Sequence, residues 1–307
     1  MAIQIFSNLN YPIGNIINQE MHEAKNVQIA VAFLKYTGVK VIEKSMRQCL
    51  DNGGSFEIIA GLDFKTTDSQ ALQYFLNLKK EYSKVNFYCF GDRKENKTDI
   101  VFHPKIYLFE KERETTGIVG SANMTKGGLM TNFEVNTVFK ETKPLYFSQL
   151  QAIYNSVKFT DSIFVPDEEY LSGYTDVFKA FSQNEEKAKK DLGLQKVIKE
   201  IQRKEEVLPG TVPSLKLMII NIIRENKKKG IEFTPLQEIY EKMEKIVEEE
   251  KLTERYKMDT FRNTIRGELN THEDNSNHPS NLNLFIRSAD KKGFYSLTQK
   301  GENYEGR

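Results

Sequence analysis

Short apolar runs alternate with amphipathic segments of helical spacing through the first half of the chain. The apolar runs are 27–32, 56–60 and 85–90. The segments with helical spacing between them are 39–50 and 69–82. This alternation favours a mixed α/β fold, in which helices flank a sheet and functional residues gather at strand ends. We expect this domain to cover residues 1–165.

Polar side chains occur in pairs at the next two strand-like runs. Residues 103–134 read HPKIYLFEKERETTGIVGSANMTKGGLMTNFE. His103 and Lys105 are two apart in a β-rich run, so they should project from one face of a strand. Ser121 and Asn123 follow a second run and are again two apart. These side chains would bring together a cation, a nucleophile or base, a hydroxyl and a carboxamide. Such a set suits a phosphoryl group, because its charge is spread over several oxygens.

These residues resemble the signature of the phospholipase D superfamily, which is HxK followed by GSxN. Glu134 falls where the nuclease branch carries an acidic residue. The Asp that often follows the lysine in this superfamily is replaced here, because that region reads Phe109-Glu110. The chain looks most like the single-motif, metal-independent type II restriction endonucleases of the superfamily. The resemblance covers roughly residues 100–139 and implies a phospholipase D-like mixed sheet flanked by helices.

The resemblance also implies a mechanism for hydrolysis of a phosphodiester in double-stranded DNA. One histidine attacks phosphorus to form a phosphohistidine, and a second protonates the leaving oxygen and then activates water. Lys105 and Asn123 would hold the non-bridging oxygens, Ser121 would donate a supporting hydrogen bond, and Glu134 would orient a histidine. No metal or other cofactor is expected.

A single chain contains one HxK. His22 is followed by Glu-Ala, His272 by Glu-Asp and His278 by Pro-Ser. Because the chemistry needs two histidines at one phosphate, we expect a homodimer that shares one active site.

Two other functions remain open at the level of sequence. The chain could be a phosphodiesterase for phospholipids or other substrates, although the departure at Phe109-Glu110 moves it away from the lipases. It could also be an inactive scaffold that binds nucleic acid as a regulator, although His103, Lys105 and Asn123 are intact. A histidine among apolar residues is often only a packed core residue, so the order of all three motif segments carries the catalytic interpretation.

The second half of the chain follows another plan. Residues 166–212 are charged and helix-prone, with a break at 209–213, and we interpret them as a helical connector that ends in a hinge. Residues 213–307 show three helical segments and two short strand-like runs, which resembles a mainly α winged-helix domain that binds DNA. Thr234-Pro235 is expected to start the second of these helices, with Thr234 as its N-cap.

The third helix of this region and the following strand connection carry the expected DNA contacts. These are Arg262, Asn263 and Arg266 in the helix and Lys291 and Lys292 in the connection. A helical dimerisation or scaffolding module would show the same apolar faces, so protein contact is an alternative.

Composition limits the class of protein further. The 44 Lys and Arg residues nearly balance the 43 Asp and Glu residues, so attraction to nucleic acid must come from local patches. Cys49 and Cys89 lie in apolar surroundings and should pack as small hydrophobes. No apolar run reaches the ~18 residues of a membrane span, and we expect a cytoplasmic protein without membrane contact. His272 and His278 lie in a polar stretch, 271–283, that we expect to be solvated rather than metal-binding.

Overall fold

The computed structural model describes residues 2–62, 66–91, 101–204, 214–253 and 255–306. The chain divides into two compact units, Met1–Asp191 and Leu192–Arg307. The expected hinge at 209–213 lies outside the described residues.

An eight-stranded mixed sheet forms the centre of the first unit. Its strand order is β1-β7-β6-β5-β2-β3-β4-β8. The strands are β1 (Ala2–Ser7), β2 (Asn26–Val31), β3 (Ser55–Gly61), β4 (Val85–Phe90), β5 (Lys105–Glu110), β6 (Thr115–Gly120), β7 (Val135–Glu141) and β8 (Ile163–Phe164). β2, β3 and β4 run parallel, whereas β5, β6, β7 and β1 form antiparallel pairs beyond β2. This mixed α/β architecture confirms the fold class expected from the alternating pattern.

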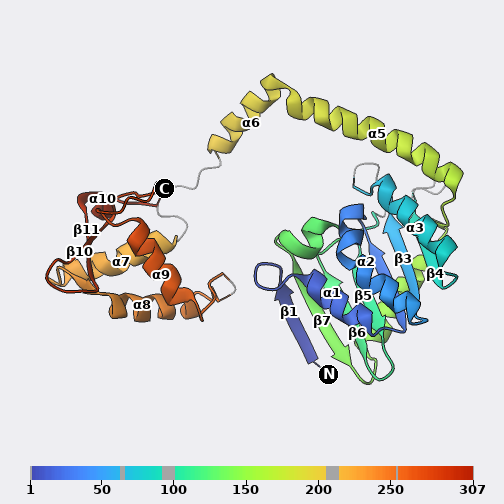
Figure 1. Ribbon diagram of the computed structural model, residues 1–307, viewed down its shortest axis with the longest axis horizontal. Helices are drawn as coiled ribbons and strands as arrows, with labels where there is room; N and C mark the ends of the chain where they lie inside the picture. The colour runs from blue at the N-terminus through green and yellow to red at the C-terminus, as the bar shows by residue number, and fades with distance from the viewer. Residues whose placement is uncertain (1, 63–65, 92–100, 205–213, 254, 307) are drawn as a thin grey trace. The chain divides into compact units, whose positions relative to one another are not determined.

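Helices cover both faces of this sheet. The larger core lies between the sheet and the first three helices, which are seen on one side of it in Figure 1. The helices are α1 (Ile13–His22), α2 (Tyr36–Asp51), α3 (Ser69–Glu81), α4 (Tyr146–Lys158) and α5 (Glu168–Lys190), with a short π-helical turn, η2 (Gly127–Thr131). α4 packs on the opposite face with a smaller core. Burial of Cys49 and Cys89 as free thiols in the larger core confirms that they pack as small hydrophobes.

The first turns of α5 belong to the first unit. Leu171 and Tyr174 are buried there, and the Tyr174 hydroxyl donates to the Thr67 carbonyl at 2.7 Å. Asp167 caps this helix by accepting from the amide of Tyr170. The segment expected as a connector therefore begins as part of the α/β unit.

The second unit contains a three-helix core beside a small antiparallel sheet. Its helices are α6 (Leu192–Lys204), α7 (Leu215–Lys228), α8 (Leu236–Glu249), α9 (Phe261–Thr271) and α10 (Gln299–Glu302). Its strands are β9 (Thr234–Pro235), β10 (Phe285–Arg287) and β11 (Phe294–Leu297), in the order β10-β11-β9. α7, α8 and α9 bury their apolar faces against Phe285 and Tyr295 of the sheet.

One expected helix start in this unit was wrong. Thr234 is not the N-cap of α8, because Thr234–Pro235 pairs with β11 and Pro235 occupies the cap position. The buried Thr234 hydroxyl instead accepts from Nδ2 of Asn226 at 3.3 Å.

No helix among the described residues is both long enough and apolar enough to cross a membrane.

Candidate active site

The strand ends at one edge of the large sheet bring the motif residues together. Lys105 is the first residue of β5 and pairs with Val31, the last residue of β2. Ser121 directly follows β6, and Glu134 directly precedes β7. Because β5 and β7 are both antiparallel to β6, the start of each lies beside the end of β6. We call this edge the catalytic edge.

His103 and Lys105 form the tightest contact of the site. The Lys105 Nζ atom lies 2.6 Å from Nδ1 and 3.1 Å from Nε2 of His103, and it donates to the His103 carbonyl at 3.0 Å. His103 is exposed and precedes the strand, whereas Lys105 is only 7% exposed. The buried Lys105 ammonium therefore positions the exposed imidazole of His103.

Burial changes the chemistry of Lys105. Desolvation lowers the pKa of its ammonium below the usual value, and the nearby negative charge of Glu134 opposes this shift. A lysine with a perturbed pKa at a convergent set of polar groups is typical of a functional site.

Ser121 and Glu134 form a second pair at the same edge. The Ser121 hydroxyl donates to Oε2 of Glu134 at 2.5 Å, and Nδ2 of Asn132 donates to Oε1 at 3.3 Å. Among the described residues, Glu134 makes no hydrogen bond to His103. Its contacts place it to orient the hydroxyl and to supply charge near Lys105, rather than to orient the imidazole of its own chain.

Asn123 is held by a hydrogen bond to the backbone of Phe33, a residue outside the motif. The Asn123 Oδ1 atom accepts from the Phe33 amide at 3.0 Å, which leaves its amide group to donate. The Phe33 ring meets His103 edge-on, with 5.6 Å between ring centroids and an angle of 84°. Phe33 follows β2 by two residues, so its position at a strand end was the available sequence signal.

Two buried residues fix the loop between Ser121 and Asn123. The Tyr107 hydroxyl donates to the Ala122 carbonyl at 2.9 Å, and Oδ1 of Asn136 accepts from the Ala122 amide at 3.3 Å. Both backbone groups of Ala122 are therefore held by side chains from neighbouring strands. Neither residue could be predicted from the sequence, in which both occupy ordinary strand positions.

Close backbone packing requires glycine at two positions beside this loop. A Cβ atom at Gly120 would lie 2.4 Å from Oδ1 of Asn136. A Cβ atom at Gly38 in α2 would lie 2.3 Å from the Met124 carbonyl oxygen. A substitution at either position would displace the segment that carries Ser121 and Asn123.

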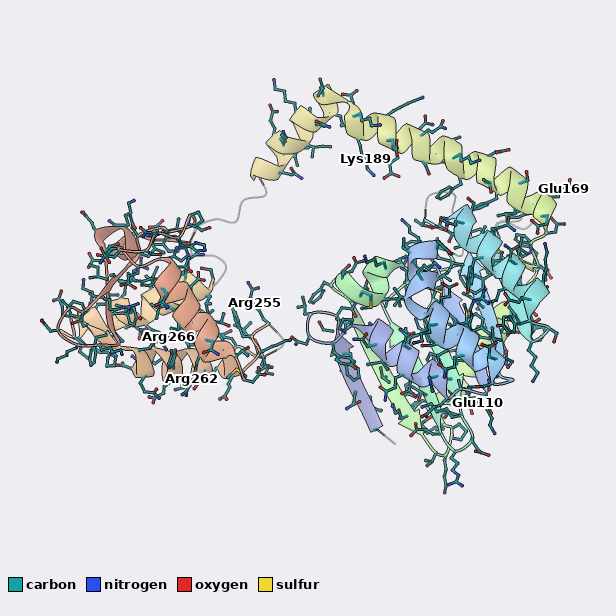
Figure 2. All side chains as sticks on the ribbon, viewed as in Figure 1. Glu110, Glu169, Lys189, Arg255, Arg262 and Arg266 are labelled. Atoms are coloured by element: carbon teal, nitrogen blue, oxygen red, sulfur yellow. The ribbon has the colours of Figure 1, made fainter. Side chains whose placement is uncertain are left out.

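The residues expected to contact DNA lie on the second unit. Arg262, Asn263 and Arg266 are exposed on α9, and Figure 2 labels both arginines there. Lys291 and Lys292 are exposed between β10 and β11. Arg262 makes two hydrogen bonds to the carboxylate of Glu244 in α8, at 2.6 and 2.9 Å. Its charge is therefore partly neutralised within the unit.

The expectation that His272 is solvated was wrong. His272 is 4% exposed and follows α9 directly, where its Nδ1 atom accepts from the Leu282 amide at 3.1 Å. Burial lowers the pKa of this imidazole. His272 therefore has a structural role in anchoring the segment before β10. Within the described ranges, no group of three or more His, Cys, Asp or Glu side chains is arranged to hold a metal ion.

Three solved structures with similar folds are NucT from Helicobacter pylori, Nuc from Salmonella typhimurium and phosphatidylserine synthase from Haemophilus influenzae. NucT is 16% identical with a TM-score of 0.38, and the match covers 50% of this chain and 94% of NucT. Nuc, described as a phospholipase D family member, is 16% identical with a TM-score of 0.37, covering 50% of this chain and 92% of Nuc. The synthase is 13% identical with a TM-score of 0.42, covering 60% of this chain and 46% of the synthase.

No curated protein matches the chain significantly. A family model described as "Cardiolipin synthase, PLD-like domain" matches residues 17–157. The matched region contains β2 to β7 and all five motif residues of the catalytic edge. Residues 17–157 are thus similar to a phospholipase D-like domain.

Proposed function

We propose that this protein is a metal-independent DNA endonuclease that acts through a phosphohistidine, and that it serves as a restriction enzyme. The observation that carries the proposal is the contact of the Lys105 ammonium with the His103 ring at an edge that also presents Ser121 and Asn123. An ammonium and a carboxamide can stabilise the charge on non-bridging phosphate oxygens, as a metal ion does in other nucleases.

In the first step, a ring nitrogen of His103 forms a bond to phosphorus while the bond to the leaving sugar oxygen breaks. A second histidine gives its proton to that oxygen. In the second step, this histidine removes a proton from water, the water oxygen bonds to phosphorus, and the bond between nitrogen and phosphorus breaks. The Lys105 ammonium contacts the ring nitrogens of His103. When DNA binds, phosphate oxygens would accept hydrogen bonds from this ammonium in place of the ring nitrogens.

The second histidine comes from another copy of the chain in this proposal. No other HxK occurs in the sequence, and His272 is buried in the second unit. A twofold dimer would place His103 and Lys105 of both subunits at one phosphate.

Lysines beside the catalytic edge support a polyanionic substrate. The Lys35 amide donates to the Met124 carbonyl at 3.0 Å, and Lys126 lies three residues after Asn123. Lys126 and Lys40 line a surface cavity of about 460 Å³ with Tyr36, Thr37 and Val41. Lys35 and Lys126 are exposed and form no ion pair within the described part of the chain. They are available to contact phosphates that flank the cleaved bond.

The second unit would supply DNA recognition. Its order α7, β9, α8, α9, β10, β11 and its three-stranded sheet support a winged helix, with α9 as the helix that reads DNA. The exposed Arg266 and Asn263 would contact base edges or phosphates, and Lys291 and Lys292 would lie in the wing.

Cleavage of supercoiled plasmid in excess EDTA tests the catalytic proposal. We expect nicked and linear products from the wild-type protein and none from folded His103→Ala, which should still bind DNA because the imidazole forms a bond to phosphorus rather than supplying affinity. Loss of cleavage on chelation, restored by magnesium, would contradict the metal-independent mechanism.

A phospholipid phosphodiesterase is the competing function, because the matching family model describes a cardiolipin synthase domain. Turnover of phosphatidylcholine or phosphatidylglycerol by the wild-type protein, without DNA cleavage, would favour this alternative.

A further inference from the structure

The turn between β1 and α1 exposes two large apolar side chains. Residues 8–12 read Asn-Leu-Asn-Tyr-Pro, and we call them the β1–α1 turn. Leu9 is 57% exposed and Tyr11 is 45% exposed. Single exposed apolar residues are common on protein surfaces, but neighbouring large ones beside a functional site indicate a binding surface. Their position relative to the catalytic edge therefore matters.

Backbone pairing places the β1–α1 turn at the catalytic edge. Ser7, the last residue of β1, pairs with Val135, the first residue of β7. The amide of Asn8 donates to the carbonyl of Glu134 at 3.3 Å. The turn thus begins beside the residue whose carboxylate accepts from the Ser121 hydroxyl.

The turn also lies on the face of the sheet that carries Lys105. Phe6 pairs with Asn136, and Asn136 pairs with Gly120. The register of β5 with β6 places Lys105 in the same row, and opposite residues point to one face. The Tyr11 ring lies over Phe6 on this side, with 6.2 Å between ring centroids. Phe6 and Lys105 are three strand spacings apart, or about 14 Å, so one substrate can reach both.

Hydrogen bonds hold the β1–α1 turn in one shape. Asn8 is buried, its Nδ2 atom donates to the Gly128 carbonyl at 2.8 Å, and its Oδ1 atom accepts from the Ile13 amide at 2.9 Å. The Ser7 carbonyl accepts from the Tyr11 amide at 3.1 Å. Because Gly128 belongs to η2, the turn is fixed to the segment that follows the motif. A surface that is already ordered loses little conformational freedom when a ligand binds.

The chemistry of the turn favours a nucleobase over a phosphate group. Residues 1–19 contain no Lys, Arg, Asp or Glu. Phosphates are bound mainly by cations, whereas every base presents an uncharged π face that can stack on an aromatic ring. Lys126, exposed at the start of η2, is the cation beside this surface that can contact the backbone of the same strand. The uncharged turn is suited to the base.

We propose that the β1–α1 turn is a subsite for a nucleobase near the cleaved phosphate, with the Tyr11 ring stacked on the base and Leu9 packed against its sugar. This inference rests on the proposed function, because that function places the DNA backbone at Lys105. A base offers a free face in a single strand, or at a duplex step that an apolar side chain has partly unstacked.

Fluorescence of 2-aminopurine tests the subsite. Short oligonucleotides that carry this base at successive positions, single-stranded or duplex, are titrated with full-length His103→Ala protein, which does not cut them. Stacking on Tyr11 should quench one position. We expect an added Tyr11→Leu to abolish this quenching and to weaken binding at least about fivefold. The slope of affinity against salt should not change, because no charge is removed.

Three further variants control the measurement. Tyr11→Phe keeps the ring, so it should retain the quenching and a dissociation constant within about twofold of the parent. Tyr146→Leu makes the same change at a tyrosine that is 38% exposed on α4, on the opposite face of the sheet, and should bind like the parent. Leu9→Ser should weaken binding by a route independent of the ring. Circular dichroism and the melting temperature check that all variants fold.

The outcomes separate the subsite from the proposed function. Unchanged quenching and affinity in Tyr11→Leu, or equal losses in Tyr11→Leu and Tyr146→Leu, would overturn the subsite even if the wild-type protein cuts DNA. Failure of the parent to bind any oligonucleotide would overturn it too. A change in sedimenting mass of Tyr11→Leu with unchanged quenching would assign the turn to a protein contact instead. If the ring-dependent quenching is found but wild type cuts no DNA in EDTA, the subsite stands and the nuclease proposal fails.

Discussion

The Nζ atom of Lys105 lies 2.6 Å from Nδ1 of His103 at the catalytic edge. An ammonium can donate only to a ring nitrogen that carries no proton, which is the form that attacks phosphorus. Lys105 is buried, and the negative charge of Glu134 lies near it. In the proposed mechanism, the protonation state of Lys105 therefore governs both the orientation of the imidazole and the positive charge that contacts the phosphate.

Deprotonation of Lys105 should set the alkaline limit of activity. Burial lowers the pKa of Lys105, so cleavage should fall at a lower pH than for an ordinary lysine. The charge of Glu134 raises that pKa, so Glu134→Gln should lower it further and move the alkaline limb to lower pH. Rates of DNA nicking measured across alkaline pH would show this. An unchanged or upward-shifted limb would contradict the coupling between the two residues.

Tyr107 should act as a positioning residue. Tyr107→Phe leaves the Ala122 carbonyl without its donor, which should cost about 1 kcal/mol of stability. The resulting shift of Asn123 should lower kcat about tenfold with KM little changed.

Tyr154→Phe is the control for this variant. Tyr154 is equally buried, but it belongs to α4 and packs in the smaller core, and its hydroxyl has no hydrogen-bond partner among the described residues. Its removal should leave kcat unchanged. Equal losses in both variants would mean that Tyr107 contributes only to folding.

A buried ion-pair cluster should make folding sensitive to acid. The Glu20 side chain has no exposed surface, and it accepts from Lys111 at 2.8 Å, Lys140 at 2.6 Å and the Thr116 hydroxyl at 2.7 Å. Burial alone would raise the pKa of Glu20, but these partners outweigh it and lower the pKa below its usual value. The resulting stabilisation is present above the carboxylate's unfolded pKa and is lost as pH falls through the folded pKa.

Glu20→Gln should lower the free energy of unfolding by about 3 kcal/mol at neutral pH, because two lysines lose their partner. Urea titrations at neutral and acid pH measure this, and the difference between wild type and variant should shrink in acid. If the difference in unfolding free energy does not change with pH, the charge of the Glu20 carboxylate does not cause the stabilisation.

Arg266 should contribute more to recognition than its neighbour Arg262, which already binds Glu244. We expect Arg266→Ala to weaken specific DNA binding by about 1–3 kcal/mol. In contrast, Lys292→Ala, which removes a phosphate-contacting lysine, should mainly reduce the salt dependence of binding. Fluorescence anisotropy at several salt concentrations, with specific and unrelated DNA, separates the two effects. Unchanged affinity in both variants would favour the second unit as a protein-contact module.

Mixed dimers examine the shared site directly. One wild-type subunit paired with one His103→Ala subunit should retain almost no steady-state turnover, because one phosphate needs both histidines. Tagged heterodimers purified by two affinity steps allow the measurement, with wild-type homodimers carrying both tags as the control. Retention of about half the activity would mean that each chain holds an independent site.

The sequence by itself determined the elements of the α/β unit and the residues that meet at its edge. The apolar runs and helical intervals located β2, β3, β4, α2 and α3 to within a few residues. His103, Lys105, Ser121 and Asn123 come together because they border consecutive antiparallel strands, so pairing alone makes them neighbours.

Only the tertiary structure decided which contacts these residues make. Phe33, Tyr107 and Asn136 support the site through hydrogen bonds between segments far apart in sequence, which no local pattern reports. Thr234 looked like a helix cap but pairs in a sheet, and His272 looked solvated but is buried, because distant strands occupy the surroundings of both. Periodicity reflects which side of an element faces a core, whereas burial and partner choice depend on what packs against that side.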